Sequence, residues 1–338
     1  MTNPVLVEVV RGDIVESRHR GAVFVCGPDG KAVLEIGDTV RPVFPRSAVK
    51  AIQALPLIET GTAEAYGFGN RELALACASH TGEAMHTELA AAMLARAGLD
   101  HTALECGTHW PFNHDAMIAL ARSGKLPTAL CNNCSGKHSA FLCTCTYEGL
   151  DHKGYVAAGH PFQQMVRETL QEVTGAVHDA GNTATDGCSI PTYAVPLTAL
   201  AQGFARMATG QGLRPERGRA ARRLLEACMA EPLLVSGTGK ADAALMQAAP
   251  GRIFTKVGAE GVYCAAVPEL GLGIALKCDD GAERGTESMV AAVLAKLFAA
   301  DDEVAARLAY LANAPISSRI GAVVGALRPT DALTSRVD

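Results

Sequence analysis

Two residues at the start of one predicted helix have types and a spacing that could support acyl transfer. The segment FPRSAVKAIQALP, residues 44–56, places Ser47 and Lys50 three positions apart, just after a proline that suits a helix start. Residues three apart lie on one face of a helix, so the two side chains are within mutual reach. A neutral lysine amine can take the proton of a serine hydroxyl and make the oxygen a nucleophile. The alternative is a serine near a helix cap beside a solvated lysine.

A second serine and a later lysine extend this pair. Ser79 lies in the small-residue segment ACASHTGE, which follows an apolar run and precedes a predicted helix. Lys256 lies in TKVGAEG, inside a predicted strand and two positions before Gly258. A Ser-x-x-Lys pair followed by a second serine and a Lys-x-Gly element is the arrangement of serine β-lactamases and penicillin-binding proteins. The alternatives are a helix-capping role for Ser79 and a solvent-facing lysine in the strand.

The segment CNNCSGKH, residues 131–138, holds the densest group of polar side chains in the chain. Cys131 and Cys134 have Cys-x-x-Cys spacing, and Lys137 and His138 follow three and four positions after the second cysteine. If a helix begins directly after Cys134, those two side chains share a face with it. This spacing indicates a site for a metal ion or for redox chemistry.

The later segment TDGCSIPT adds Asp186 and Cys188 to the possible donors. Thiolate and imidazole are the ligands that zinc prefers. Spacing alone therefore predicts a zinc site formed by Cys131, Cys134, His138 and Cys188. A redox-active Cys-x-x-Cys pair and a set of inert buried thiols are the two alternatives.

Strand patterns at both ends of the chain must position these residues. The first 40 residues alternate apolar and polar side chains, and residues 22–37 contain a Gly-Pro-Asp-Gly turn between two apolar runs, which indicates a hairpin. Strand patterns return in the segments 252–258, 261–267 and 272–281, and a helix is predicted at 284–299.

Between about Pro45 and Pro250 helical periodicity dominates. The clearest helices are predicted at 83–97, 135–148 and 162–174, each followed by a glycine. The expected fold is therefore α+β: an antiparallel sheet built from both chain ends and flanked by helices, with an inserted helical lobe.

All 338 residues are expected to form a single domain. Its sheet lobe would span about 1–45 and 250–338, and its helical lobe about 46–249. A cleft between two such lobes is a natural ligand site.

Composition excludes several classes of protein. Aromatic residues make up 5% of the chain, which argues against base stacking, and a net charge of −5 with scattered signs gives no basic surface for nucleic acid or anionic lipid. The N-terminal segment MTNPVLVEVVRGD lacks the pattern of a signal peptide, and the uncharged stretch 187–205 is interrupted by prolines and polar residues. With eleven cysteines and no export signal, we expect a soluble protein of the reducing cytoplasm.

Five blocks taken in order resemble the rhizobial-type L-asparaginase family, and the resemblance spans almost the whole chain. The blocks are PRSAVKA, ASHTGE, CNNCSGKH, DGCSIPT and TKVGAEG. Members of that family have a fold similar to serine β-lactamases and glutaminases, form homodimers and hydrolyse L-asparagine to L-aspartate and ammonia. The resemblance implies the same fold, activity and assembly for this chain.

The resemblance also implies roles for single residues. It pairs Ser47 with Lys50 and Ser79 with Lys256, and makes the first serine the nucleophile that forms an acyl-enzyme. Its zinc ligands would be Cys134, Lys137 and Cys188, with Asp186 close to the water on the metal. This set replaces Cys131 and His138 of the spacing prediction by a lysine. The residues expected to bind the substrate are Arg46, Asn133, His138 and Asp186.

Two rival functions stay open from the sequence. A glutaminase or β-lactamase-like enzyme would use the same serine–lysine pairs on another amide. A zinc- or redox-responsive binding protein would use the cysteines and no nucleophile.

Overall fold

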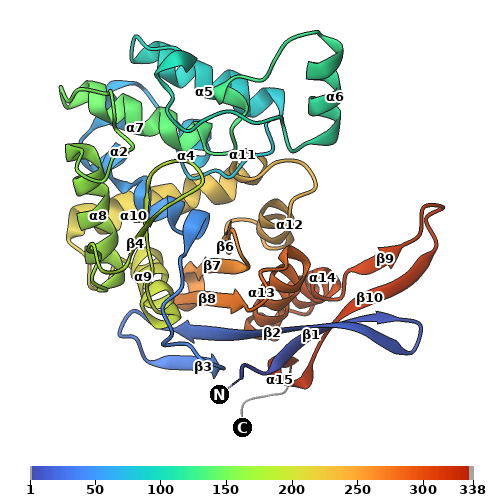
Figure 1. Ribbon diagram of the computed structural model, residues 1–338. Coiled ribbons are helices and arrows are strands. Elements are labelled where there is room, and N and C mark those ends of the chain that lie inside the picture. Colours follow the sequence, from blue (N-terminus) through green and yellow to red (C-terminus); the bar gives the residue numbers. More distant parts are fainter. Residues whose placement is uncertain (1, 335–338) are drawn as a thin grey trace.

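The computed structural model describes residues 2–334 and is built around an antiparallel sheet (Figure 1). Within these residues the sheet has eight strands in the order β6-β7-β8-β2-β1-β10-β9, with β3 paired to β2. Its strands are β1 (Val5–Arg11), β2 (Ile14–Cys26), β3 (Ala32–Ile36), β6 (Phe254–Gly258), β7 (Val262–Val267), β8 (Leu272–Cys278), β9 (Pro315–Ser317) and β10 (Val323–Pro329). The predicted sheet from both chain ends is therefore confirmed.

Strand β2 joins the two ends of the chain. It pairs with β1 on one side, and on the other its second half pairs with β8, with Phe24 opposite Ala275. The predicted hairpin is confirmed by the pairing of β2 with β3, where Val23 lies opposite Ile36. Neighbouring strands can therefore come from residues about 250 positions apart in sequence, as Phe24 and Ala275 are.

Alternation along β2 divides the core into two layers. Phe24 faces the large apolar core of the helical region, and Val23 and Val25 face a second core beneath the sheet. Helix α9 (Leu197–Thr209) packs on β8 from the first side, while α13 (Glu283–Leu297) covers the second side together with α14 (Asp302–Ala312). Because both faces are covered, this part of the strand is apolar throughout.

Helices fill most of the chain between β3 and β6, as predicted. The further helices are α1 (Lys50–Gln53), α2 (Leu55–Glu59), α3 (Thr62–Ala65), α4 (Asn70–Ala76), α5 (Ala84–Arg96), α6 (His114–Arg122), α7 (Ser135–Tyr147), α8 (Pro161–Thr174), α10 (Pro215–Ala230), α11 (Pro232–Val235), α12 (Ala241–Ala248) and α15 (Asp331–Thr334). Short 3₁₀ helices are η1 (Arg46–Val49), η2 (His101–Ala103), η3 (Ala129–Cys131) and η4 (Pro268–Leu270). The helices predicted at 83–97, 135–148, 162–174 and 284–299 correspond to α5, α7, α8 and α13.

A two-stranded sheet, β4 (Thr183–Thr185) with β5 (Pro191–Tyr193), interrupts the helical region. It was not predicted, and neither were β9 and β10. All eleven cysteines are buried free thiols. Across residues 2–334 no helix combines the length and the apolar character needed to cross a membrane.

Candidate active site

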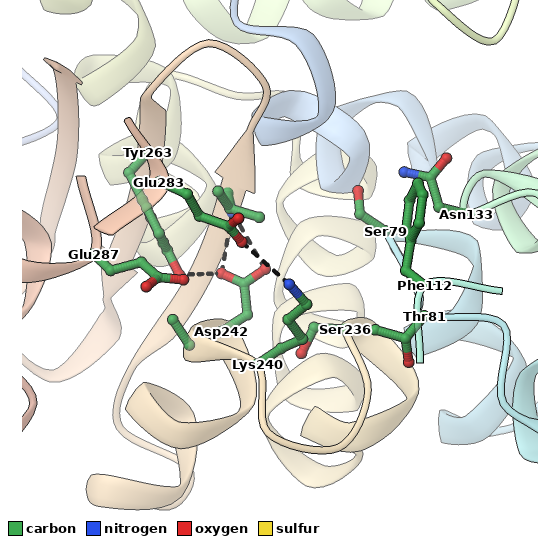
Figure 2. A pocket seen from close by; sticks show the side chains of 12 residues that line it. Ser79, Thr81, Phe112, Asn133, Ser236, Lys240, Asp242, Tyr263, Glu283 and Glu287 are labelled. Carbon is green, nitrogen blue, oxygen red and sulfur yellow. Dashed lines mark hydrogen bonds and ion pairs between the residues drawn. The ribbon is translucent and has the colours of Figure 1, made fainter. Parts of the chain in front are cut away.

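Two adjoining clefts lie where the helical region meets the sheet. The larger has a volume of about 410 Å³ and the smaller about 280 Å³. Ser79, Asn133, Val257 and Glu283 line both, and Ser47 lines the smaller one. Figure 2 shows the larger cleft, with Ser79 and Asn133 on one side and the side chains of α12, β7 and α13 on the other. Both serines predicted from the sequence therefore open onto one composite cleft.

The turn that carries Ser47 is tightly built. Ser47 lies in η1 directly after Arg46, which has a positive φ of 52°. Strand β6 packs against this turn at Gly258, where an added Cβ would lie 2.3 Å from Pro45 O. A glycine is therefore required in the Lys-x-Gly element, because only a residue without a side chain lets the strand approach the serine turn.

Backbone strain is concentrated around this cleft. Within residues 2–334 the non-glycine residues with positive φ are Arg46, Ser189 and Glu260. The first precedes Ser47, the second follows Cys188, and the third lines the smaller cleft. Strained backbone of this kind clusters at functional sites because the surrounding structure must hold it in place.

Lys50 is buried and ends at Ser79. Its side chain is 1% exposed, and its Nζ donates to Ala78 O at 2.5 Å and to Ser79 Oγ at 2.9 Å. No hydrogen bond from Nζ reaches Ser47 among the described residues. Burial lowers the pKa of Lys50, with an opposing effect of Cys134 and further lowering by Lys137. A solvated lysine, the alternative considered from the sequence, does not describe this side chain.

Ser79 is held by backbone contacts and caps no helix. Its N–H donates to Val235 O at 2.9 Å, and the N–H of His80 donates to Asn133 O at 3.1 Å. The N-cap of α5 is Glu83, four residues later. The hydroxyl of Ser79 is thus presented to the cleft and to Lys50.

Lys256 has a different partner from the one expected. Its side chain is fully buried, and its Nζ lies 3.4 Å from Asp242 Oδ2 and donates to Val257 O at 3.1 Å. Asp242 also accepts the hydroxyl of Tyr263 at 2.5 Å. The lysine expected beside Ser79 therefore forms a buried ion pair with a carboxylate from α12.

Cys134, Lys137 and Cys188 converge beside Lys50. Lys137 Nζ donates to Cys188 Sγ at 3.2 Å, and all three residues are at most 5% exposed. A hydrogen bond from the Cys188 thiol holds the pKa of Cys134 well below its usual value, against the effect of burial and with the help of Lys50. Two cysteine sulfurs, a ligand type that zinc prefers, therefore lie beside the Lys137 side chain, whose nitrogen could join them as a ligand only after losing its proton.

The surroundings of Lys137 favour its protonated form. Burial opposes its charge, but Cys188, Cys134 and Asp186 outweigh this effect and raise its pKa. Ligation would therefore release a proton, as metal binding to protonated donors does.

The zinc set predicted from spacing alone does not assemble. Among the described residues, the group of three or more His, Cys, Asp or Glu donors within 4.8 Å of one another is His19, Cys278 and Asp280, and not Cys131 with Cys134 and His138. His19 donates to Asp280 and accepts from Arg284 Nε at 3.2 Å. With both ring nitrogens engaged, that group is a hydrogen-bonded cluster and not a metal centre.

The four residues predicted to bind substrate lie in different surroundings. Arg46 Nε donates to Asp186 Oδ1 at 2.7 Å, so these two are joined, and Asn133 lines both clefts. Burial would raise the pKa of Asp186, but Lys137 and Arg46 lower it, so the carboxylate is charged. His138 is fully buried, with Nδ1 2.7 Å from the Tyr155 hydroxyl, and its Nε2 has no hydrogen-bond partner within residues 2–334.

Several cleft residues were not found from the sequence. They are Thr81, Phe112, Ser236, Lys240, Asp242, Tyr263, Glu283 and Glu287. Lys240 pairs with Glu283 at 3.2 Å. Burial, helped by Glu283, raises the pKa of Glu287 to about 7. The one local signal was the charged segment KAD before an apolar helix, which is too common to single out a site.

Two kinds of comparison with known proteins give matches, and a third gives none. Solved structures that this chain matches include a β-lactamase from Mycobacterium bovis, 13% identical over 79% of this chain and 89% of that chain, with a TM-score of 0.39. Another is a D-alanine carboxypeptidase from Burkholderia cenocepacia, 14% identical over 85% and 92%, with a TM-score of 0.40. Both are distant, and neither bears on the substrate. A search of curated proteins finds no significant match.

The sequence matches the family model described as L-asparaginase II over residues 7–329. This match covers nearly the whole chain, including every residue of the two clefts. The chain therefore belongs to the L-asparaginase II family of amidohydrolases.

Proposed function

We propose that the protein is an L-asparaginase that hydrolyses L-asparagine to L-aspartate and ammonia through a serine acyl-enzyme. The observation that carries this proposal is the buried Lys50, which ends 2.9 Å from Ser79 Oγ in a cleft that Ser47 also lines. A lysine in this position can act as a base because it faces a hydroxyl and a carbonyl and not a carboxylate.

In the first half of the reaction Ser47 Oγ attacks the side-chain amide carbon of asparagine while Lys50 takes its proton. The distance between these residues can shorten once substrate is bound, since catalytic hydrogen bonds are often loose without it. Ala48 N–H already donates to Pro45 O at 3.0 Å, which leaves the Ser47 N–H as the candidate oxyanion donor in this turn.

The tetrahedral intermediate then collapses, the C–N bond breaks and an aspartyl ester remains on Ser47. The leaving nitrogen takes a proton, so the product is ammonia. We assign the transfer of that proton from the lysine to the leaving group to Ser79, and its hydrogen bond with Lys50 supports this role. Water then attacks the ester, aspartate leaves and the Ser47 hydroxyl is restored.

Zinc is proposed as the cofactor, held by Cys134, Lys137 and Cys188. When bound, it would supply a Lewis acid that can orient an oxygen of the substrate. Arg46, Asn133, His138 and Asp186 are proposed to surround the substrate. The joined Arg46 and Asp186 offer one positive and one negative group, which suits the α-carboxylate and α-ammonium of an amino acid. A cytoplasmic homodimer is proposed from the resemblance.

The test is ammonia release by the purified protein from L-asparagine and L-glutamine, beside hydrolysis of a chromogenic β-lactam. We expect rapid release from asparagine and little from the other two. Preference for glutamine or the β-lactam would identify a different amidohydrolase. Bound zinc without turnover of any amide would indicate a binding protein.

A further inference from the structure

Asp242 is a buried carboxylate at the floor of the cleft for which the proposed reaction has no use. It is 1% exposed, and it lines the larger cleft with Ser79 and Tyr263. Figure 2 shows its carboxylate facing the Tyr263 hydroxyl, across the cleft from Ser79. It is the second residue of α12, where the helix dipole favours a negative charge.

The carboxylate contacts both the side chain and the backbone of the Lys256 segment. Oδ2 lies 3.4 Å from Lys256 Nζ, and Oδ1 accepts the N–H of Val257, the next residue in β6, at 3.0 Å. Tyr263, from the neighbouring strand β7, donates to the same Oδ1. Burial and the adjacent Asp242 raise the pKa of Tyr263 well above its usual value, so its hydroxyl keeps the proton it donates.

Stability alone gives no reason for an ion pair at this depth. The side chains of Asp242 and Lys256 are both fully inaccessible to solvent. Replacing such a pair by apolar residues of similar size is often neutral or stabilising, because desolvation offsets the attraction between the charges. Asp242 is nevertheless one of the residues that line the active-site cleft, which points to a role of the pair in the reaction.

We propose that Asp242 is a positioning residue that fixes the Lys256 ammonium near Lys50 of the serine–lysine pair. Tyr263 orients the carboxylate of Asp242. Lys256 is then a fixed cation held between Asp242 and Val257 O, close enough for its charge to act on Lys50. This inference rests on the proposed serine–lysine function.

A double-mutant cycle tests it. We measure kcat and KM on asparagine for the wild type, Asp242→Asn, Lys256→Met and the double variant. If Asp242 acts through Lys256, Asp242→Asn lowers kcat on the order of 10- to 100-fold with KM within about threefold, as expected for a misplaced group. In the Lys256→Met background, Asp242→Asn should lower kcat little further, because the lysine that Asp242 positions has been removed.

Tyr263→Phe keeps the ion pair and removes one hydroxyl, so it serves if Asp242→Asn folds poorly. We expect a smaller loss of kcat, roughly three- to tenfold, again absent in the Lys256→Met background. The control is Glu59→Gln, which breaks the Glu59–Arg217 pair in the helical region and should lower Tm without changing kcat. Wild-type kcat in Asp242→Asn, or a loss that adds fully to that of Lys256→Met, would overturn the proposal.

Failure of the proposed function gives a different result. If the wild type releases no ammonia from any amide, the cycle is read on the rate of covalent labelling by a fluorophosphonate, which needs an activated serine and no asparagine. Coupled losses in that rate would support Asp242 as the positioning residue of another serine hydrolase. Equal labelling of all four proteins would overturn it.

Discussion

Two buried lysines, Lys50 and Lys256, each contact a residue that lines the larger cleft, and their partners differ. Lys50 comes from the helical side and ends on a carbonyl and the Ser79 hydroxyl. Lys256 comes from the sheet and ends on the carboxylate of Asp242. Burial disfavours the charged form of a lysine, whereas a nearby carboxylate favours that form. We therefore expect Lys50, on the helical side, to supply the base and Lys256, on the sheet side, to supply a fixed positive charge.

The largest effect should follow from removing Ser47, the proposed nucleophile on the helical side. Ser47→Ala is expected to abolish turnover, by several powers of ten in kcat, and to leave the fold intact, because a small residue fits the turn. Mass spectrometry of a stalled wild-type reaction should find an aspartyl adduct on the Ser47 peptide. An adduct on Ser79, the serine that Lys50 already contacts, would exchange the roles of the two serines.

Arginine substitutions separate the two lysines. Arginine keeps a positive charge but cannot give up its proton, so it can replace a fixed cation and not a base. Lys50→Arg should lose nearly as much kcat as Ser47→Ala, whereas Lys256→Arg should lose on the order of 10-fold. Circular dichroism and Tm verify that both variants fold. Substantial activity in Lys50→Arg would show that this lysine supplies only charge, and the base would then be sought at Lys256.

Removal of the thiols tests the third buried lysine, Lys137, which ends on sulfur. Wild-type protein should contain about one zinc per chain, and Cys134→Ala or Cys188→Ala should lose it, measured by elemental analysis. If zinc orients substrate, these variants should lose more in KM than in kcat. Unchanged kinetics without metal would contradict that role. Zinc retained after loss of both cysteines would point back to Cys131 and His138.

The smallest expected effect is on stability and concerns Glu287, on the sheet side of the cleft. The pKa of Glu287 is raised from its ordinary 4.5 to about 7, first by burial and then by Glu283. A raised folded-state pKa gives a contribution to stability that is present below about pH 4.5 and is lost as pH rises through about 7. The free energy of unfolding of Glu287→Gln, relative to that of the wild type, should therefore rise from pH 5 to pH 8 by on the order of 1 kcal/mol. Thermal melts at both pH values measure it, and a pH-independent difference would contradict the raised pKa.

Much of the fold follows from local pattern. Helices α5, α7, α8 and α13 have apolar periodicity and a glycine or polar end, and the β2–β3 hairpin has a turn sequence between two apolar runs. Strands β9 and β10 were not predicted, because their residues are mostly half-exposed or exposed and buried and exposed positions do not alternate strongly. Their pairing with β1 depends on the tertiary fold.

The sequence by itself determined the family, because the two serines, the two lysines and the cysteine-rich segment stand in blocks whose order indicates it. Only the tertiary structure decided the partners. Lys50 lies three residues from Ser47 but bonds to Ser79, 29 residues away, and Lys256 meets Asp242 across the α12–β6 contact. The physical reason is that a buried charge takes the partner that packing brings within reach. Spacing along one helix places neighbours on a face but cannot tell which group from another element will lie against them.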